Sequence, residues 1–138
     1  MDNKGRGLAS KSTGTSTRKE QGDEAEARAL VYLQRQGLRL VERNYRVALG
    51  PRVRAGEVDL ILRDGDGTLV FVEVRQRAGL SHGGAAASVT ATKQRRIVLA
   101  ARHYLLRQVS PPPCRFDVLA IDGEQMQWLQ AAFDAGSF

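Results

Sequence analysis

The sequence predicts a small α/β domain with a mixed β-sheet, and three observations favour this class. Helical and strand periodicities follow one another in the order helix, three strands, helix, and one or two further strands. The length of 138 residues allows one ordinary domain, and a hydrophobic content of 42% is enough for a buried core. The single Cys excludes a disulfide framework and a cysteine-rich zinc site.

The N-terminal segment, residues 1–20, is expected to be a disordered basic tail ahead of a single domain over residues 21–138. Residues 1–19 are rich in Gly, Ser, Thr and Lys, and they hold five Lys or Arg against one Asp, so they supply most of the net charge of +6. Such a composition buries too little apolar surface to fold. The positive charge favours nucleic acid or an acidic membrane surface as a partner.

Membrane insertion and secretion are not indicated by the sequence. No apolar run approaches the roughly 20 residues that span a bilayer, and the N-terminus has no apolar signal segment. We therefore expect a cytoplasmic protein that makes no membrane contact.

The first helix is predicted to begin near Asp23 and to end at Gly37. Apolar residues recur between these points at the spacing of one helix face, and Gly commonly ends a helix. Glu24 and Glu26 in the expected first turn suit the positive end of the helix dipole.

Three strands are expected to follow this helix. The first begins at Leu38, and residues 50–55 are interpreted as a loop because they contain Gly, Pro and two Arg. Residues 56–64 alternate strictly between apolar and polar. The turn Asp64-Gly65-Asp66-Gly67 then predicts a hairpin to a strand over residues 68–77.

A second helix is predicted over residues 89–107, after a loop at residues 78–88. Its apolar stripe faces the core, and another face carries a basic stripe of Lys93, Arg96, His103 and Arg107. Prolines end this segment. Residues 115–121 then alternate as a further strand, and residues 126–129 are compatible with a short edge strand.

A pair of carboxylates on neighbouring strands is the feature that bears most on chemistry. Asp59 and Glu73 face the same side of the sheet if the hairpin register brings them opposite each other. Two carboxylates held close repel each other unless a cation lies between them, and Mg²⁺ prefers such oxygen ligands. A surface salt-bridge network with Arg63, Arg75 and Arg77 explains the same spacing, so the residues alone leave both interpretations open.

Four blocks of the sequence closely resemble, in order, the YraN family of small bacterial proteins: GEVDLI, VFVEVRQR, GGAAASVTATKQRR and CRFDVLAI. The resemblance covers residues 21–134. That family is similar to archaeal Holliday junction resolvases and to the PD-(D/E)xK nuclease superfamily. The resemblance implies a restriction endonuclease-like core of a helix, a three-stranded meander, a second helix and a further strand. It also implies Mg²⁺- or Mn²⁺-dependent cleavage of DNA, with branched or structured DNA as a candidate substrate.

The resemblance assigns catalytic roles to Glu26, Asp59, Glu73 and Arg75, and metal binding to Asp59 and Glu73. Glu26 looks like the helix-borne acid of the resolvase-like branch. Arg75 occupies the position of the superfamily's Lys, which is a departure, because Arg is always protonated and cannot accept a proton. It can still hold a phosphate through two hydrogen bonds. A non-catalytic nucleic-acid-binding module therefore stays as an alternative.

Nucleic acid, DNA above all, is the expected partner, with flanking phosphates bound by Arg77, Lys93, Arg96 and Arg107. Lys93 is the one Lys outside the tail, which makes it a candidate for the missing Lys, although its place at a helix start favours a solvated side chain. A homodimer is compatible with relatives that act on two strands. A third interpretation is a partner-binding protein whose acidic residues are purely structural.

Overall fold

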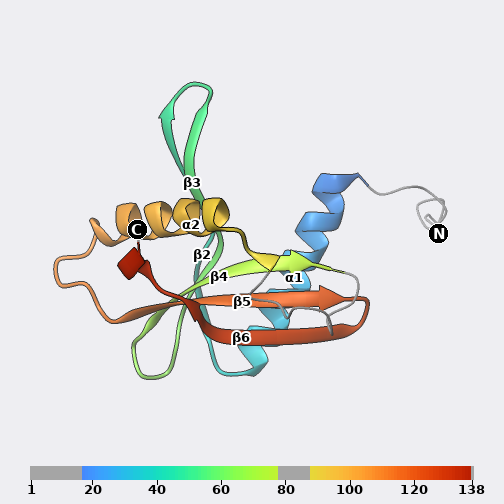
Figure 1. Cartoon of the computed structure of the whole chain (residues 1–138). Helices are drawn as coiled ribbons and strands as arrows, with labels where there is room; N and C mark the ends of the chain where they lie inside the picture. The colour runs from blue at the N-terminus through green and yellow to red at the C-terminus, as the bar shows by residue number, and fades with distance from the viewer. Residues whose placement is uncertain (1–16, 78–87, 138) are drawn as a thin grey trace, which may run out of the picture.

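Figure 1 shows the chain as a computed structural model, which describes residues 17–77 and 88–137. The elements in chain order are α1 (Arg18–Arg35), β2 (Arg39–Gly50), β3 (Val53–Arg63), β4 (Leu69–Gln76), α2 (Ala91–Leu105), β5 (Cys114–Asp122), β6 (Gln125–Phe133) and the short 3-10 helix η3 (Ala135–Ser137). The predicted class and order are confirmed. The edge strand expected at residues 126–129 is present and longer, as β6.

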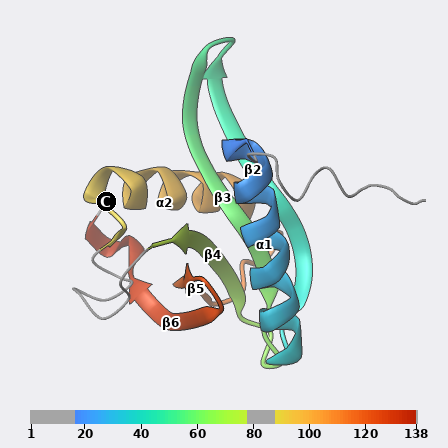
Figure 2. The ribbon, with the colours of Figure 1, turned by 90° about the vertical axis from the view of Figure 1, so that its right-hand side faces the viewer.

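The strands of the described residues form one mixed sheet in the order β2-β3-β4-β5-β6. All neighbours are antiparallel except β4 and β5, which run parallel and are connected through α2. Figure 2 shows α1 on one side of the sheet and α2 on the other. This is the helix, meander, helix and strand core that the resemblance implied.

Helix α1 starts earlier than the sequence periodicity indicated. The Thr17 side chain accepts a hydrogen bond from the Glu20 backbone N–H, and the Glu20 carboxylate accepts one from the Thr17 N–H, each at 3.0 Å. This capping box satisfies backbone donors at the helix start and extends the helix into the segment assigned to the tail. Glu26 therefore lies in the middle of α1 rather than in its first turn. Residues 1–16 lie outside the described residues.

The loop predicted at residues 50–55 is wrong, because β2 and β3 continue pairing almost to their shared turn. Gly50 pairs with Val53, so only Pro51 and Arg52 are left as the turn. By contrast, β3 pairs with β4 only from Leu60 to Arg63. Residues 44–59 therefore leave the sheet as a two-stranded extension, which we call the ribbon (Figure 2). Cross-strand pairing outweighs the local Gly and Pro signal here.

Two apolar clusters, one on each face of the sheet, form the core. Along β4, Leu69 and Phe71 pack with α2, whereas Val70 and Val72 pack with α1. Side chains alternate between the two faces of a β-strand, so Glu73, two residues after Phe71, points toward the side of α2. Within the described residues, no helix is long and apolar enough to cross a membrane.

Candidate functional site

The candidate site lies where β3 and β4 separate. Their pairing ends at Leu60 and Val72, which leaves the next backbone donor on β4 without a strand partner. The Asp59 carboxylate replaces that partner, because its Oδ2 accepts a hydrogen bond from the Val74 N–H at 2.9 Å. This contact holds the Asp59 side chain beside Glu73. The structure thus brings together the two carboxylates that the sequence placed on neighbouring strands.

Glu73 is 2% exposed, and its partners are incomplete. Its Oε2 lies 3.6 Å from Lys93 Nζ and 3.9 Å from Arg75 Nη1, whereas its buried Oε1 has no hydrogen-bond partner in the described part of the chain. Burial and the charge of Asp59 raise the pKa of Glu73 to about 8. Burial also raises the pKa of Asp59, and the two carboxyl groups share a hydrogen bond. At neutral pH the pair therefore retains one proton.

Lys93 is part of this cluster, so the interpretation of a solvated helix-start residue is wrong. Its side chain is 26% exposed, and its Nζ lies 3.3 Å from Glu57 Oε2 as well as near Glu73. The Thr90 side chain caps α2 by accepting a hydrogen bond from the Lys93 N–H, which sets the orientation of the first turn. Burial opposes the charge on Lys93, but the carboxylates Glu73 and Glu57 outweigh it and raise the pKa of the ammonium group.

Glu26 approaches the same region from α1. Its side chain is half-buried, and its Oε1 has no hydrogen-bond partner among the described residues. Burial and the charge of Asp59 raise the pKa of Glu26 to about 7, against a hydrogen bond from the Asn44 side chain. Asn44 has a positive φ of 52°, a conformation that Asn tolerates better than most residues. The structure thus places Glu26 within electrostatic reach of the carboxylate pair.

Sequence reasoning did not single out Glu57 or Asn44. Glu57 lies two residues before Asp59, so period-2 alternation offered a signal for it on the same strand. Asn44 gave no signal, because its role depends on the unusual backbone conformation within β2.

The remaining predicted cations are separated from one another. Arg75 is half-buried near Glu73, and Arg77 follows the end of β4, next to residues 78–87, which lie outside the described residues. Arg96 is exposed on α2. Lys93 binds carboxylates rather than facing solvent with Arg96. The basic stripe expected on one helix face is therefore not observed as such.

Arg107 lies beyond the end of α2, whose C-cap is Leu106. Its guanidinium lies 4.9 Å from the ring centroid of Tyr104 and 3.4 Å from Glu42 Oε1. With a rise of about 1.5 Å per residue, the helix separates Arg107 from Lys93 by about 20 Å. The structure therefore does not bring Arg107 to the carboxylates, and α2 ends two residues before the predicted end at Arg107.

The Asp59–Glu73 pair fits a divalent cation better than it fits water alone. In the described ranges no group of three or more His, Cys, Asp or Glu residues is arranged to hold a metal ion. Mg²⁺, however, needs only one or two carboxylates and keeps several waters. Such a cation would coordinate the Oε1 of Glu73, which has no hydrogen-bond partner among the described residues. It would also stabilise the ionised form of the Glu73 carboxyl group, which burial and Asp59 disfavour.

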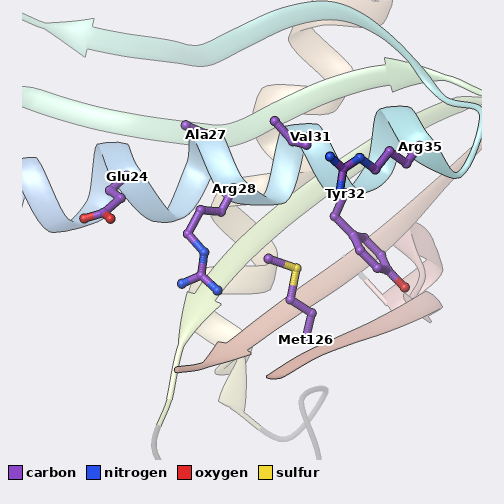
Figure 3. Close-up of a pocket in the computed structure, with 7 residues that line it drawn as sticks. All are labelled: Glu24, Ala27, Arg28, Val31, Tyr32, Arg35 and Met126. Atoms are coloured by element: carbon purple, nitrogen blue, oxygen red, sulfur yellow. The ribbon is translucent and has the colours of Figure 1, made fainter. Parts of the chain in front are cut away.

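A separate pocket lies on the outer side of α1 against β6, away from these carboxylates (Figure 3). The residues that line it are Glu24, Ala27, Arg28, Val31, Tyr32, Arg35 and Met126. The lining is mainly apolar, and no carboxylate pair converges on it. This pocket is a concave surface, but it lacks the paired carboxylates found at the β3–β4 junction.

Comparison with known proteins places the chain in a family. A family model described as "Uncharacterised protein family UPF0102" matches residues 25–121. A UPF0102 protein of Methylibium petroleiphilum is 72% identical over 119 residues, which are 86% of this chain and 98% of that protein. A UPF0102 protein of Albidiferax ferrireducens is 61% identical over 123 residues, 89% of this chain and 94% of that protein. The chain therefore belongs to the UPF0102 family, which is the YraN family that its sequence blocks resemble.

Proposed function

We propose that this protein is a metal-dependent endonuclease that hydrolyses phosphodiester bonds of DNA. The observation that carries the proposal is the Asp59–Glu73 pair, in which Glu73 is buried and Asp59 half-buried, with the Lys93 ammonium 3.6 Å from Glu73. Burying two adjacent carboxylates costs folding free energy unless charge or hydrogen bonds compensate for it. Carboxyl groups whose pKa is raised by burial and by each other are typical of functional sites.

Asp59, Glu73 and the backbone carbonyl of Val74 would hold Mg²⁺ or Mn²⁺. When bound, such an ion lowers the pKa of a coordinated water and polarises a phosphoryl oxygen. The protein's own contribution is to keep both carboxylates on rigid strands. Their separation is fixed by the Asp59 contact with the Val74 N–H, at 2.9 Å.

The two cationic side chains of the site, Arg75 and Lys93, have different roles in this proposal. Arg75 cannot accept a proton, so its role is to neutralise the charge that develops on the scissile phosphate. Position 75 on β4 holds Arg where the resembled nucleases have Lys. Lys93 reaches Glu73 from α2 and supplies an ammonium group in its place. There it donates hydrogen bonds that orient the attacking water. Glu26, with a pKa raised to about 7, can take up a proton at Oε1 near neutral pH.

A cleavage assay tests this proposal directly. The purified chain is incubated with duplex, single-stranded, flapped and four-way-junction DNA, in Mg²⁺, Mn²⁺ or EDTA. We expect cuts that require the metal and that fall by about 10²-fold or more in Asp59→Asn and Glu73→Gln. Glu24→Gln, which removes an exposed carboxylate of α1, is the matched control and should cleave normally. Metal-dependent cuts that persist in both site variants would contradict the proposal.

A second candidate function is a nucleic-acid-binding module that has lost catalysis. Arg75 in place of the superfamily's Lys favours it, together with the ion pairs that Lys93 already makes to Glu57 and Glu73. DNA binding without cuts in either metal would support this second function over the first.

A further inference from the structure

We propose that the ribbon and the outer face of α2 form one surface that grips duplex DNA, with the ribbon in the groove and the α2 arginines on the phosphate backbone. This inference deepens the proposed function, because it names the duplex as the form of DNA held next to the carboxylates. Its evidence comes from residues outside the catalytic cluster.

The ribbon has the shape of an element that binds in a DNA groove. Because β4 pairs with β3 only from Leu60 to Arg63, residues 44–59 have no neighbour in the sheet other than each other. Figures 1 and 2 show the ribbon projecting past both helices. At about 3.3 Å per residue, its strands extend about 20 Å. A two-stranded ribbon of this kind fits the major groove of DNA, which is about 12 Å wide.

The outer part of the ribbon carries positive charge. Residues 44–56 hold three Arg and no Asp or Glu. Arg46 and Arg52 are exposed, and Arg52 lies in the turn at the tip. The acidic residues Glu57 and Asp59 occur only at the base, where the candidate site lies. An isolated two-stranded hairpin is only marginally stable in water, so a projecting one gains from a partner that contacts both strands.

A basic groove lies at the base of the ribbon, along α2. The groove is lined by Ala55, Thr92, Arg95, Arg96, Val98, Leu99 and Arg102. Its lining thus contains three arginines from one face of α2 and no carboxylate. A repeating anion such as the phosphodiester backbone matches this arrangement, whereas an acidic lining would repel it.

Gly56 fixes the helix against the ribbon. A Cβ at this position would lie 2.6 Å from the Arg96 carbonyl oxygen and 2.9 Å from the Ala100 nitrogen. Only Gly permits this approach, so α2 and the base of the ribbon are held as one unit. Asp59 lies at that base, with Lys93 on the side of α2 and Glu26 on the side of α1. A duplex bound along this surface would therefore run past the base of the ribbon, where Asp59 lies.

Binding measurements in EDTA test this surface without requiring catalysis. Fluorescence anisotropy follows a labelled blunt duplex over a series of salt concentrations, in the full chain carrying Glu73→Gln. The ribbon variant is Arg46→Glu with Arg52→Glu, and the helix variant is Arg95→Glu with Arg96→Glu. The matched control is Arg35→Glu with Arg39→Glu, which changes the net charge equally at exposed positions at the end of α1 and the start of β2.

We expect each test variant to weaken duplex binding by about 10-fold or more and to lower the salt slope by about two, since each lost phosphate contact removes about 0.9 from it. The control should change affinity by less than about 3-fold. Circular dichroism melting confirms that each variant is folded. Equal losses in all three variants, or no loss in the test pair, would overturn the proposal.

Two further outcomes would also overturn it. Equal competition by vesicles of anionic phosphatidylglycerol would show that the surface recognises a lipid headgroup layer instead. Duplex-independent dimers that dissociate in the ribbon variant would show that the ribbon pairs with a second copy of the chain. A cleavage assay separates this inference from the proposed function. If the parent protein binds duplex DNA, the test variants bind it more weakly and no cuts are seen, only the proposed function is contradicted. If the protein makes metal-dependent cuts but the test variants bind duplex DNA as well as the parent, only the proposed DNA-binding surface is contradicted.

Discussion

Two buried carboxylates on neighbouring parallel strands have opposite surroundings. Asp117 of β5 is 0% exposed, and Glu73 of β4 is 2% exposed, one residue along the register from it. Asp117 accepts hydrogen bonds from Arg115 Nε at 3.0 and 3.2 Å, from Trp128 Nε1 at 2.9 Å and from the Ala131 N–H at 2.9 Å. Glu73 Oε1 has none within the described residues.

The contrast shows that burial alone does not identify a functional carboxylate. Both side chains are removed from water, but only Asp117 receives donors at both oxygens. A buried carboxylate whose two oxygens both accept hydrogen bonds stabilises the fold. A buried carboxylate that faces another carboxylate and has one oxygen without a donor has its pKa raised. The completeness of hydrogen bonding therefore separates the structural acid from the candidate functional one.

The largest effect is expected on removing the structural acid. Asp117→Ala leaves the Arg115 Nε–H, the Trp128 N–H and the Ala131 N–H without their acceptor, while Arg115 Nη1 keeps its contact with Asp64. The free energy of unfolding should fall by about 3–5 kcal/mol, as for other broken buried charge pairs. Urea denaturation measures this loss. A change as small as that of an exposed site, such as Glu124→Ala on the β5–β6 turn, would contradict the role given to Asp117.

The next effect concerns Lys93 and Arg75, the two cations at Glu73. We expect Lys93→Met to lower cleavage by about 10²-fold, or about 2.7 kcal/mol in activation free energy, because it removes the ammonium nearest to Glu73. Arg75→Lys should retain cleavage, since it restores the Lys found at this position in the nucleases that the sequence resembles. Single-turnover rates at saturating DNA measure both effects. A rate unchanged in Lys93→Met would leave Arg75 as the sole cation required.

A pH-dependent stability is expected from Glu73. The folded protein keeps the Glu73 proton up to about pH 8, whereas the unfolded chain loses it near the ordinary value of 4.5. Between these values the folded state binds more protons, so stability should fall as pH rises from 4.5 to 8. Glu73→Gln removes this loss, and we expect it to be more stable than the parent protein at pH 8.5 by at least about 1 kcal/mol.

Thermal melts at pH 5.5 and 8.5 check this expectation. Added Mn²⁺ should stabilise the parent protein at pH 8.5 and leave Glu73→Gln unchanged, because only the parent offers both carboxylates to the ion. Glu124→Gln, at an exposed position of the β5–β6 turn, is a matched control for the loss of one carboxylate. Equal pH profiles for the parent and Glu73→Gln would show that the pair is not held as the structure has it.

The apolar part of the fold was predictable because it depends on local periodicity. The alternation of Val70, Phe71 and Val72 fixed which face of β4 each residue occupies, and the structure confirms it. The extent of β2 and β3 was not predictable in the same way. Their pairing across Pro51 and Arg52 depends on contacts between strands that local Gly and Pro preferences do not report.

The candidate site was predictable in its acids but not in its cations. Asp59 and Glu73 lie on strands joined by a short turn, so their proximity follows from hairpin register. Lys93 lies on a helix that returns to the sheet over an intervening loop, and its contact with Glu73 depends on how closely α2 packs at Gly56. The spacing of residues along the sequence does not report how closely α2 packs against β3.

The smallest effect is expected at the helix caps, and it separates the two helices that flank the carboxylates. Thr17→Ala and Thr90→Ala each remove one capping acceptor, which should cost about 1 kcal/mol of unfolding free energy or less. The Thr90 change also loosens the turn that carries Lys93, whereas the Thr17 change loosens only the start of α1. We therefore expect similar urea midpoints for the two variants and a larger loss of cleavage in Thr90→Ala. Equal cleavage in both would show that Lys93 is positioned by its carboxylate partners rather than by the cap.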